Sequence, residues 1–499
     1  MTFRLTGETD FAGQSTAYAR DQAGNAWQVT NRINEVTRTT FDPLNRPTRL
    51  DYLKDGTAET FAYDAAGNLA SAVNGTVSYG FQYDTLNRLQ SKTDSRGRSL
   101  AFTWDKAGRL LTKTTYQGST TSYTYDGAGT LVALSNPDYL AVNYQYAAAG
   151  RLLTRIMSSG AKSLYTYDAG GWLASLTHTD AVGSPVVAQG YSRDRVGNIT
   201  ALGVTLGPNA GTTSYTLDAR YRLTAVDAPG TANDEAFSYD HLGNRLTATR
   251  GGTSIGAAGS TTKYVIYHPA TQTGSPGYTA TNNNRLKEIR LGSLTGTIDS
   301  RFTFDNEGRL TSQTGSTPRN LTWDAKNRLK TLTQGGSTET YRYDPSNHRI
   351  GRSGGALGNL DYYLEGEHLE SVEQSGTLQE KYFRGSTVDE LVAGYLNQNG
   401  KLTPVFFQHD HVMSTVAQTK PNGGTQASLA YTAFGETLAT TGSPVGRLKF
   451  TGREADGNGC YYYRARYYCT GMDQFISEDP LKKYVGVRGP SWRPFSAPR

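Results

Sequence analysis

One short sequence pattern recurs along the chain at an almost constant interval, and it constrains the fold more than any other feature. Its clearest copy is Phe102–Leu110, which reads Phe-Thr-Trp-Asp-Lys-Ala-Gly-Arg-Leu. The aspartates of the first six copies lie 21, 22, 20, 21 and 21 residues apart, at Asp21, Asp42, Asp64, Asp84, Asp105 and Asp126. A unit of this length is too short to bury its own apolar face, so we expect stacked units that share one core.

Each unit has the pattern of a β-hairpin. Aromatic and polar residues alternate before the aspartate, as in Tyr123–Tyr125, which predicts a half-buried strand. The Asp carboxylate can accept backbone N–H groups within a tight turn, and the fourth turn residue needs the positive φ that Gly or Asn tolerates. We therefore predict type I turns with a G1 bulge, and only Tyr221 departs from the rule at the fourth position. The predicted turn residues include Asp105 and Gly108, Asp126 and Gly129, Asp168 and Gly171, and Asp305 and Gly308.

Composition agrees with a long β-repeat protein. The 499 residues include 56 Gly and 33 Tyr, which suits many turns and many aromatic strand positions. The net charge of +6 is small for this length and no dense Lys/Arg run occurs, so we expect no nucleic-acid partner. No long apolar run predicts a membrane span, and no signal peptide follows Met1. We expect no cofactor and no bound metal.

The motif Tyr-Asp-x-x-Gly-Arg-Leu at this period resembles the YD repeats of the RHS family, which includes bacterial Rhs proteins, the C components of Tc toxins and the teneurins. The resemblance covers nearly the whole chain. It implies an all-β array of YD-repeat hairpins that spirals into a hollow shell, here incomplete at the N-terminus because the sequence begins within a repeat. We predict a repeat array over residues 1–350, an RHS-associated core over 351–480 and a short variable tail over 481–499, with Gly351–Gly358 as a connection.

The region after residue 350 also resembles the RHS core, through Phe450–Glu454, Tyr461–Tyr468 and Asp479–Pro480. In the family this core cleaves itself with a pair of aspartates, helped by an arginine, and releases a C-terminal domain.

The resemblance implies that Asp479 and Arg466, or Arg464 in its place, are remnants of that machinery. Lys482 stands where the motif has Gly, and the second aspartate would fall near position 501, past Arg499. An aspartic dyad needs two carboxylates that share a proton, so we expect no autoproteolysis and no enzymatic activity.

Two further clusters could carry chemistry. His409 and His411 would share one face of a strand while Asp410 points away, so only two ligands would converge and a metal site is not expected. Cys460 and Cys469 lie nine residues apart around an aromatic hairpin. We expect two free core thiols there, with a disulfide as the alternative.

The resemblance implies a non-catalytic shell that encloses a C-terminal toxin for delivery in competition between bacteria, here without a recognisable toxin domain. The implied partners are the toxin cargo or its immunity protein and proteins of a secretion apparatus. The implied location is outside the cell or on its surface, after export by a dedicated secretion system. The alternative is an extracellular adhesion protein of the wall-associated type, which binds carbohydrate or protein.

Overall fold

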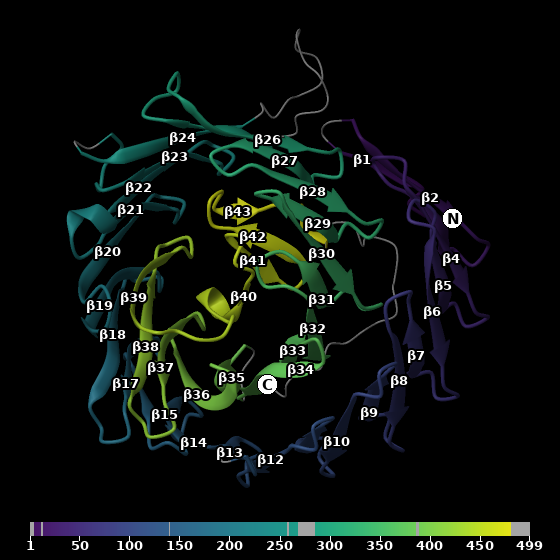
Figure 1. Cartoon of the computed structure of the whole chain (residues 1–499), viewed down its shortest axis with the longest axis horizontal. Helices are drawn as coiled ribbons and strands as arrows, with labels where there is room; N and C mark the ends of the chain where they lie inside the picture. Colours follow the sequence, from purple (N-terminus) through teal and green to yellow (C-terminus); the bar gives the residue numbers. More distant parts are fainter. Residues whose placement is uncertain are drawn as a thin grey trace.

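The chain folds into one long antiparallel β-sheet followed by a small second sheet, which confirms the predicted all-β class (Figure 1). The computed structural model describes residues 4–10, 13–138, 140–256, 259–267, 285–385 and 389–480. Within these residues, 39 strands form the long sheet, and strands that are neighbours in the chain are neighbours in the sheet. Four more strands form the second sheet.

The turn that joins the two strands of a hairpin is built by its Asp and Gly. The Gly108 N–H donates to the Asp105 carbonyl over 3.1 Å, and the Asp105 N–H donates to the Arg109 carbonyl over 2.9 Å. Gly108 has a φ of 84°, and the strand register shifts between Thr103 and Trp104, as in a G1 bulge. The Asp105 carboxylate accepts the Arg109 N–H over 2.8 Å and pairs with the guanidinium of the same residue.

The other predicted turns have the same geometry. In each, the Gly N–H donates to the Asp carbonyl over 2.9 to 3.0 Å, for Asp126 and Gly129, Asp168 and Gly171, and Asp305 and Gly308. The exception, Tyr221, adopts a φ of 60° at the same position. A left-handed conformation costs a non-glycine residue about 1 kcal/mol, so the pairing of the two flanking strands imposes this turn.

Where the residue before the turn is Tyr or Trp, it ties its hairpin to the preceding one. The Tyr125 hydroxyl donates to the Leu110 carbonyl over 3.0 Å, and the Trp104 indole N–H donates to the Leu89 carbonyl over 2.8 Å. The same bond recurs from Tyr63 to Pro47, Tyr83 to Leu69, Tyr146 to Leu131, Tyr167 to Leu152, Tyr239 to Leu223, Trp323 to Leu310 and Tyr343 to Leu329. The recurrent aromatic residue therefore has a structural role.

The arginine after the turn joins the same two hairpins. Arg109 pairs with Asp105 in its own turn, and its guanidinium carbon lies 4.9 Å from the ring centroid of Tyr125 in the next hairpin. Arg46 lies over Tyr63 at 4.4 Å in the same way. These contacts are cation–π interactions, which are worth about 0.5–1 kcal/mol at partly exposed sites.

The hairpins up to residue 291 curve into a ring, which we call the first turn (Figure 1). It also contains the short 3₁₀ helix η1, Thr231–Asn233. Its strands are β1 (Gly7–Thr9), β2 (Ser15–Arg20), β3 (Ala26–Thr30), β4 (Val36–Phe41), β5 (Pro47–Tyr52), β6 (Thr57–Tyr63), β7 (Leu69–Val73), β8 (Ser78–Tyr83), β9 (Leu89–Asp94), β10 (Ser99–Trp104), β11 (Leu110–Thr115), β12 (Thr120–Tyr125), β13 (Leu131–Asn136), β14 (Leu140–Tyr146), β15 (Leu152–Met157), β16 (Lys162–Tyr167), β17 (Leu173–Thr179), β18 (Pro185–Arg193), β19 (Ile199–Leu206), β20 (Gly211–Leu217), β21 (Leu223–Asp227), β22 (Glu235–Tyr239), β23 (Arg245–Arg250), β24 (Thr261–Tyr267) and β25 (Leu286–Leu291).

The sheet then passes the N-terminal strands and continues inside the ring as a second turn (Figure 1). Its strands are β26 (Ile298–Phe304), β27 (Leu310–Gly315), β28 (Arg319–Trp323), β29 (Leu329–Gln334), β30 (Ser337–Tyr343), β31 (Arg349–Gly354), β32 (Leu360–Glu365), β33 (His368–Gln374), β34 (Thr377–Arg384), β35 (Leu391–Gln398), β36 (Lys401–His409), β37 (Thr415–Thr419), β38 (Thr425–Tyr431) and β39 (Thr437–Gly442).

Contacts between the two turns show that the spiral tightens. Arg32 bonds to a residue 275 positions further on, Arg155 to one 235 further and Arg250 to one 186 further. The second turn therefore takes fewer residues than the first to cover the same arc.

The apolar core lies between the two turns. Phe61 and Tyr79 of the first turn belong to one buried cluster with Tyr382 and Phe407 of the second. Burial of each such side chain stabilises the fold by roughly 1.5–3 kcal/mol, so the second turn holds the ring in its curved form.

The terminal sheet lies within the ring, beside the second turn (Figure 1). It follows the 3₁₀ helix η2 (Phe450–Gly452) and is made of β40 (Glu454–Ala455), β41 (Cys460–Tyr463), β42 (Arg466–Cys469) and β43 (Gln474–Phe475). Its inner face packs on Leu310, Leu329 and Tyr343 of the second turn. This sheet therefore rests on the wall from inside.

Strand pairing runs without a break across residue 350. The boundary between array and core was predicted from a change in the sequence pattern, and this division stays a prediction. One expectation was wrong: half of Gly351–Gly358 belongs to β31 and not to a connection, because Arg352 and Gly351 pair with Leu360 and Asp361 of β32. The predicted tail, 481–499, lies outside the described residues. In the described part of the chain, no helix is long and apolar enough to cross a membrane.

Replacing Tyr125 by Phe tests the bond between hairpins. We expect Tyr125→Phe to lower the free energy of unfolding by about 1 kcal/mol, because the Leu110 carbonyl loses its donor. Urea denaturation of the purified chain measures this. Tyr221→Phe is the matched control, since Tyr221 is 61% exposed and its substitution should change stability by less than about 0.5 kcal/mol. Equal effects of the two substitutions would contradict a structural role for the bond.

Candidate functional site

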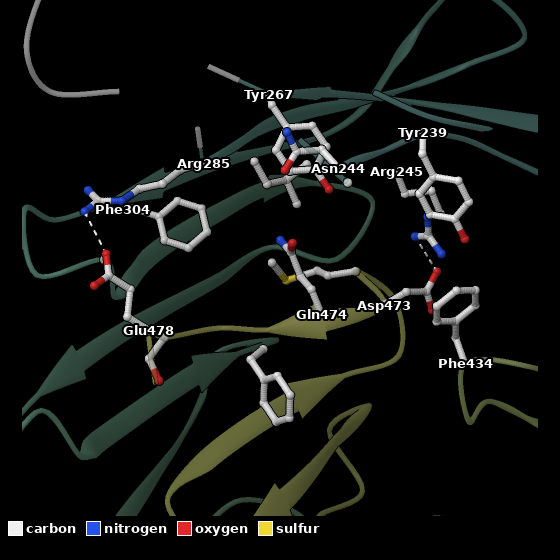
Figure 2. Close-up of a pocket in the computed structure, with 16 residues that line it drawn as sticks. Tyr239, Asn244, Arg245, Tyr267, Arg285, Phe304, Phe434, Asp473, Gln474 and Glu478 are labelled. Atoms are coloured by element: carbon white, nitrogen blue, oxygen red, sulfur yellow. Dashed lines mark hydrogen bonds and ion pairs between the residues drawn. The ribbon is translucent and has the colours of Figure 1, made fainter. Parts of the chain in front are cut away.

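The site that the fold singles out lies where the last described strands meet both turns of the spiral. A cavity of about 450 Å³ opens between β22–β26 and the terminal strand β43 (Figure 2). Five aromatic rings line it, from Tyr239, Tyr267, Phe304, Phe434 and Phe475. Rings from strands this far apart in the chain offer faces and edges on which a planar or apolar group can stack.

The charges of the cavity are arranged in pairs. Arg245 bonds to Asp473 over 2.7 Å, and Arg285 bonds to Glu478 over 3.4 Å (Figure 2). Burial raises the pKa of Asp473, and the guanidinium of Arg245 opposes that rise. The lining therefore provides stacking surfaces and hydrogen bonds around two neutralised ion pairs.

The predicted catalytic remnants do come together. Asp479 and Arg466 form an ion pair of 3.0 Å, and the Arg466 guanidinium carbon lies 3.8 Å from the Phe475 ring centroid. The neighbouring carboxylates of Asp473 and Glu478 pair with other arginines. Carboxylates held by arginines differ from two carboxylates that share a proton, so the absence of autoproteolysis remains our prediction.

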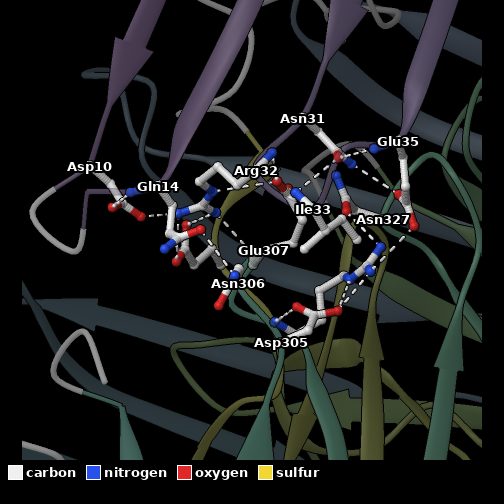
Figure 3. A network of polar contacts seen from close by, with 12 residues as sticks. Asp10, Gln14, Asn31, Arg32, Ile33, Glu35, Asp305, Asn306, Glu307 and Asn327 are labelled. Atoms are coloured by element: carbon white, nitrogen blue, oxygen red, sulfur yellow. Dashed lines mark hydrogen bonds and ion pairs between the residues drawn. The ribbon is translucent and has the colours of Figure 1, made fainter. Parts of the chain in front are cut away.

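A polar seam, formed by Asp10, Arg32, Glu307 and Glu478, joins the two turns next to this site (Figure 3). Arg32 bonds to Asp10 over 2.9 Å, to Glu478 over 2.8 Å and to Glu307 over 3.4 Å. Burial alone would lower the pKa of Arg32, but the bond with Glu478 and the nearby carboxylates raise it well above its ordinary value. One arginine therefore fastens the N-terminal strands, the second turn and the end of the terminal sheet together.

Similar ion pairs follow the contact between the turns. Lys326 meets Glu59 at 2.9 Å, Lys113 meets Glu370 at 2.9 Å, and Arg155 meets Glu390 at 3.1 Å. Each joins a residue of the first turn to one of the second. Because the partners are largely buried, loss of either member would leave an uncompensated charge.

A buried arginine supports the terminal sheet in the same manner. Arg349 of β31 is fully buried, bonds to Asp456 and Glu454, and lies 4.3 Å from the ring centroid of Tyr462. Burial would lower the pKa of Arg349, but the charge of Asp456 and the neighbouring tyrosines raise it well above its ordinary value. The arginine thus remains charged within the aromatic cluster.

The expectation for the two cysteines was wrong. Cys460 and Cys469 form a disulfide, because they are directly opposite each other in the β41–β42 hairpin. Their Cα atoms lie 4.0 Å apart. The sequence spacing allowed the bond, but the register that brings the sulfurs together was not predictable from spacing alone.

The strand expected across His409, Asp410 and His411 was also wrong. β36 ends at His409, and Asp410 begins a turn in which its carboxylate accepts the Ser414 N–H over 2.8 Å. His411 instead packs its ring edge-on against Tyr191, with centroids 5.0 Å apart. This segment is another Asp turn. The sequence did not indicate it because Met413, with a φ of 65°, occupies the position that has Gly or Asn in other copies.

Sequence reasoning missed the seam. Arg32 and Glu307 are far apart in the chain, and neither stands at one of the recurrent positions of the repeat motif. The one available signal was Glu307 itself, since Ala107 and Ala128 occupy its position in other copies of the turn. A charged residue at a position that is apolar in many other copies indicates a contact particular to that part of the spiral.

Comparisons with known proteins agree with this architecture. The family model described as Teneurin YD-shell matches residues 23–179. No curated protein sequence matches the chain.

Several solved structures share the fold. The crystal structure of TcdB2-TccC3-TEV matches with a TM-score of 0.73 at 15% identity, over 94% of this chain and 26% of that chain. The crystal structure of TcdB2-TccC3 matches with a TM-score of 0.64 at 15% identity, over 95% of this chain and 29% of that chain. A Tc holotoxin pore of Photorhabdus luminescens matches with a TM-score of 0.56 at 14% identity, over 96% of this chain and 28% of that chain.

The spiral of Asp-turn hairpins thus has the architecture of a shell wall. Residues 23–179 thus resemble the YD-shell of the teneurins, and the chain shares its fold with the solved TcdB2-TccC3 structures. It spans less than a third of the length of each solved chain that it matches here.

Replacing Arg32 by Met tests the polar seam. We expect Arg32→Met to lower the free energy of unfolding by about 3 kcal/mol, because Asp10, Glu307 and Glu478 would lose their shared partner. Denaturation measures the loss, and hydrogen exchange should show faster exchange at Asp305–Gly308. Arg38→Met is the control, since Arg38 is exposed and bonds only to Gln28 among the described residues. Unchanged exchange at the seam in Arg32→Met would contradict this account.

Proposed function

We propose that this chain is a non-catalytic wall segment of a shell that encloses a toxin cargo at its C-terminal side, for delivery in competition between bacteria. The observation that carries the proposal is the placement of the last strands. β43 lies inside the ring (Figure 1), and the residue after it is bonded to the wall, where the Leu310 N–H donates to the Ile476 carbonyl over 2.9 Å. A segment that continues from β43 would begin inside the wall and not on its outer face.

The ring of the first turn has two edges, and the contacts at each of them support the proposal that the wall is larger than this chain. Asp305–Gly308 of the second turn packs on Arg32, and the Ala325 N–H donates to Asp55 over 2.8 Å. The β-turns that begin with Asp in the second turn of the spiral thus pack on one edge of the first turn. This edge is the one opposite to the edge that carries the first turn's own Asp β-turns.

The Asp turns of the first turn carry apolar side chains in solvent. Leu44, Leu86, Val196 and Leu242 follow their aspartates by two residues and are 71%, 64%, 60% and 54% exposed. Exposed apolar side chains gathered along one edge are typical of an interaction surface. A further turn of the spiral could pack on this exposed edge in the way that the second turn packs on the first.

The matched structures support the same view, because they are more than three times the length of this chain and include a Tc holotoxin pore. The remaining wall would come from further sequence or from a second chain. The partners of such a shell are its toxin cargo or the cognate immunity protein and the proteins of a secretion apparatus. Its place of action is outside the producing cell.

Site-specific proteolysis tests the proposal. The same protease recognition sequence is inserted after Pro480 in one variant and before Met1 in another, each in the full chain. We expect the site after Pro480 to be cleaved at least about tenfold more slowly, because it begins within the ring and is reached only by local opening. An open array that displays a binding face, as in an adhesion protein, predicts equal rates, and equal rates would overturn the proposal.

A further inference from the structure

A buried arginine lies against the disulfide of the terminal sheet. Arg319 is the first residue of β28 and only 7% exposed. Its Nη1 lies 3.3 Å from the Cys460 Sγ and 3.8 Å from the Cys469 Sγ. The two cysteines are 3% and 1% exposed, so the guanidinium and the sulfurs share one desolvated space.

The charge of Arg319 lacks the compensation that neighbouring arginines have. Arg349 pairs with Glu454 and Asp456, and Arg352 lies 3.4 Å from Glu339. In the described part of the chain Arg319 forms no ion pair, and its Nε has no hydrogen-bond partner.

The surroundings of Arg319 explain why its charge is costly. The disulfide belongs to a cluster with Leu321, Leu332, Tyr341 and Tyr467. Burial lowers the pKa of Arg319, and only the hydroxyl of Tyr341 opposes that effect. A buried cation without a counter-ion is unfavourable, and an anion formed beside it would be stabilised.

Reduction of the disulfide supplies that anion. Apolar burial raises the pKa of a cysteine, but a neighbouring arginine lowers that pKa and favours release of the thiolate. We propose that Cys460 and Cys469 form a reducible redox centre, whose substrate is a dithiol or protein thiol reductant and whose reduced form is stabilised by Arg319. A neutral disulfide gains little from the guanidinium, whereas the Cys460 thiolate would form a buried ion pair with it.

The exchange balances as an ordinary two-electron reduction. A thiolate of the reductant attacks the Cys469 sulfur, the S–S bond breaks, and Cys460 leaves as a thiolate beside Arg319. The second thiol of the reductant then attacks the mixed disulfide, loses its proton to solvent and releases Cys469, which takes up a proton. The reductant departs as its own disulfide. Since both sulfurs are buried, the hairpin must open transiently before the first attack.

Reduction would loosen the end of the described chain. The disulfide clamps β41 to β42, β42 pairs with β43, and the Ile476 N–H donates to the Tyr467 carbonyl over 3.0 Å. The strands that hold Asp479 to the wall would therefore exchange faster in the reduced protein. An oxidising exterior would keep the Cys460–Cys469 disulfide intact, and a reducing cytosol would reduce it. This consequence rests on the proposed function.

Equilibration of the full chain in dithiothreitol redox buffers tests the redox centre without reference to any cargo. The oxidised fraction is counted by thiol alkylation and mass spectrometry, from pH 6.5 to 8. We expect the equilibrium constant for reduction to rise about tenfold per pH unit in the wild type, because one proton is released when Cys460 stays a thiolate. In Arg319→Met the constant should be at least about tenfold smaller at pH 7.5 and nearly independent of pH.

Arg319→Lys keeps the charge and should retain the pH dependence, while Arg38→Met is the control on an exposed arginine. A pH-independent constant in the wild type would overturn the proposal, even if Arg319→Met failed to fold. So would equal constants in the wild type and Arg319→Met. Slow cleavage after Pro480 together with a pH-independent constant would leave the shell function standing and remove only the redox centre.

Discussion

The architecture depends on a hydrogen bond between one hairpin and the next. Where a Tyr or Trp precedes the turn, it donates to a carbonyl beside the preceding bulge, as Tyr125 does to Leu110. The arginine after the turn pairs with the turn Asp and covers that aromatic ring, as Arg109 does with Asp105 and Tyr125. Such a copy of the motif closes its own turn and fixes the orientation of its neighbour, so each added hairpin packs on the one before it.

Curvature requires a second kind of interaction. Hairpins linked only to their neighbours would form a ribbon, and what bends the ribbon into a wall is contact between turns of the spiral. Aromatic side chains such as Phe61 and Tyr382 bury the apolar part of this contact, and ion pairs such as that of Arg32 and Glu478 fix its register. The bond between adjacent hairpins is local, so the repeat motif specifies the ribbon. The contact between turns of the spiral is not local, so it depends on individual residues that differ from copy to copy.

This division explains how much of the fold was predictable. The Asp turns, the bulges and the all-β class follow from Asp105, Gly108 and their copies, since turn chemistry is local. The turn at Asp410 was missed because Met413 fills a position where only Gly or Asn gives a signal. The Arg32 seam and the Cys460–Cys469 bond were missed because each depends on a register between segments that no spacing in the sequence specifies.

The same reasoning assigned Asp479 and Arg466 to one place through resemblance, and the two side chains do meet there. It gave no indication of the cavity, whose five rings come from five separate stretches of the chain, at Tyr239, Tyr267, Phe304, Phe434 and Phe475. Sites of that kind arise from packing between distant elements, and they become visible only once the spiral is assembled.

Electron cryo-microscopy of the purified chain tests the central claim most directly, because the claim concerns shape. The account predicts a closed ring of hairpins with the second turn inside it and with Arg32 in contact with Glu307 and Glu478. An open ribbon in which the hairpins remain paired but the two turns do not touch would contradict it. That result would still agree with the role of the repeat motif in hairpin pairing, but it would rule out the contact between turns as the cause of the curved wall.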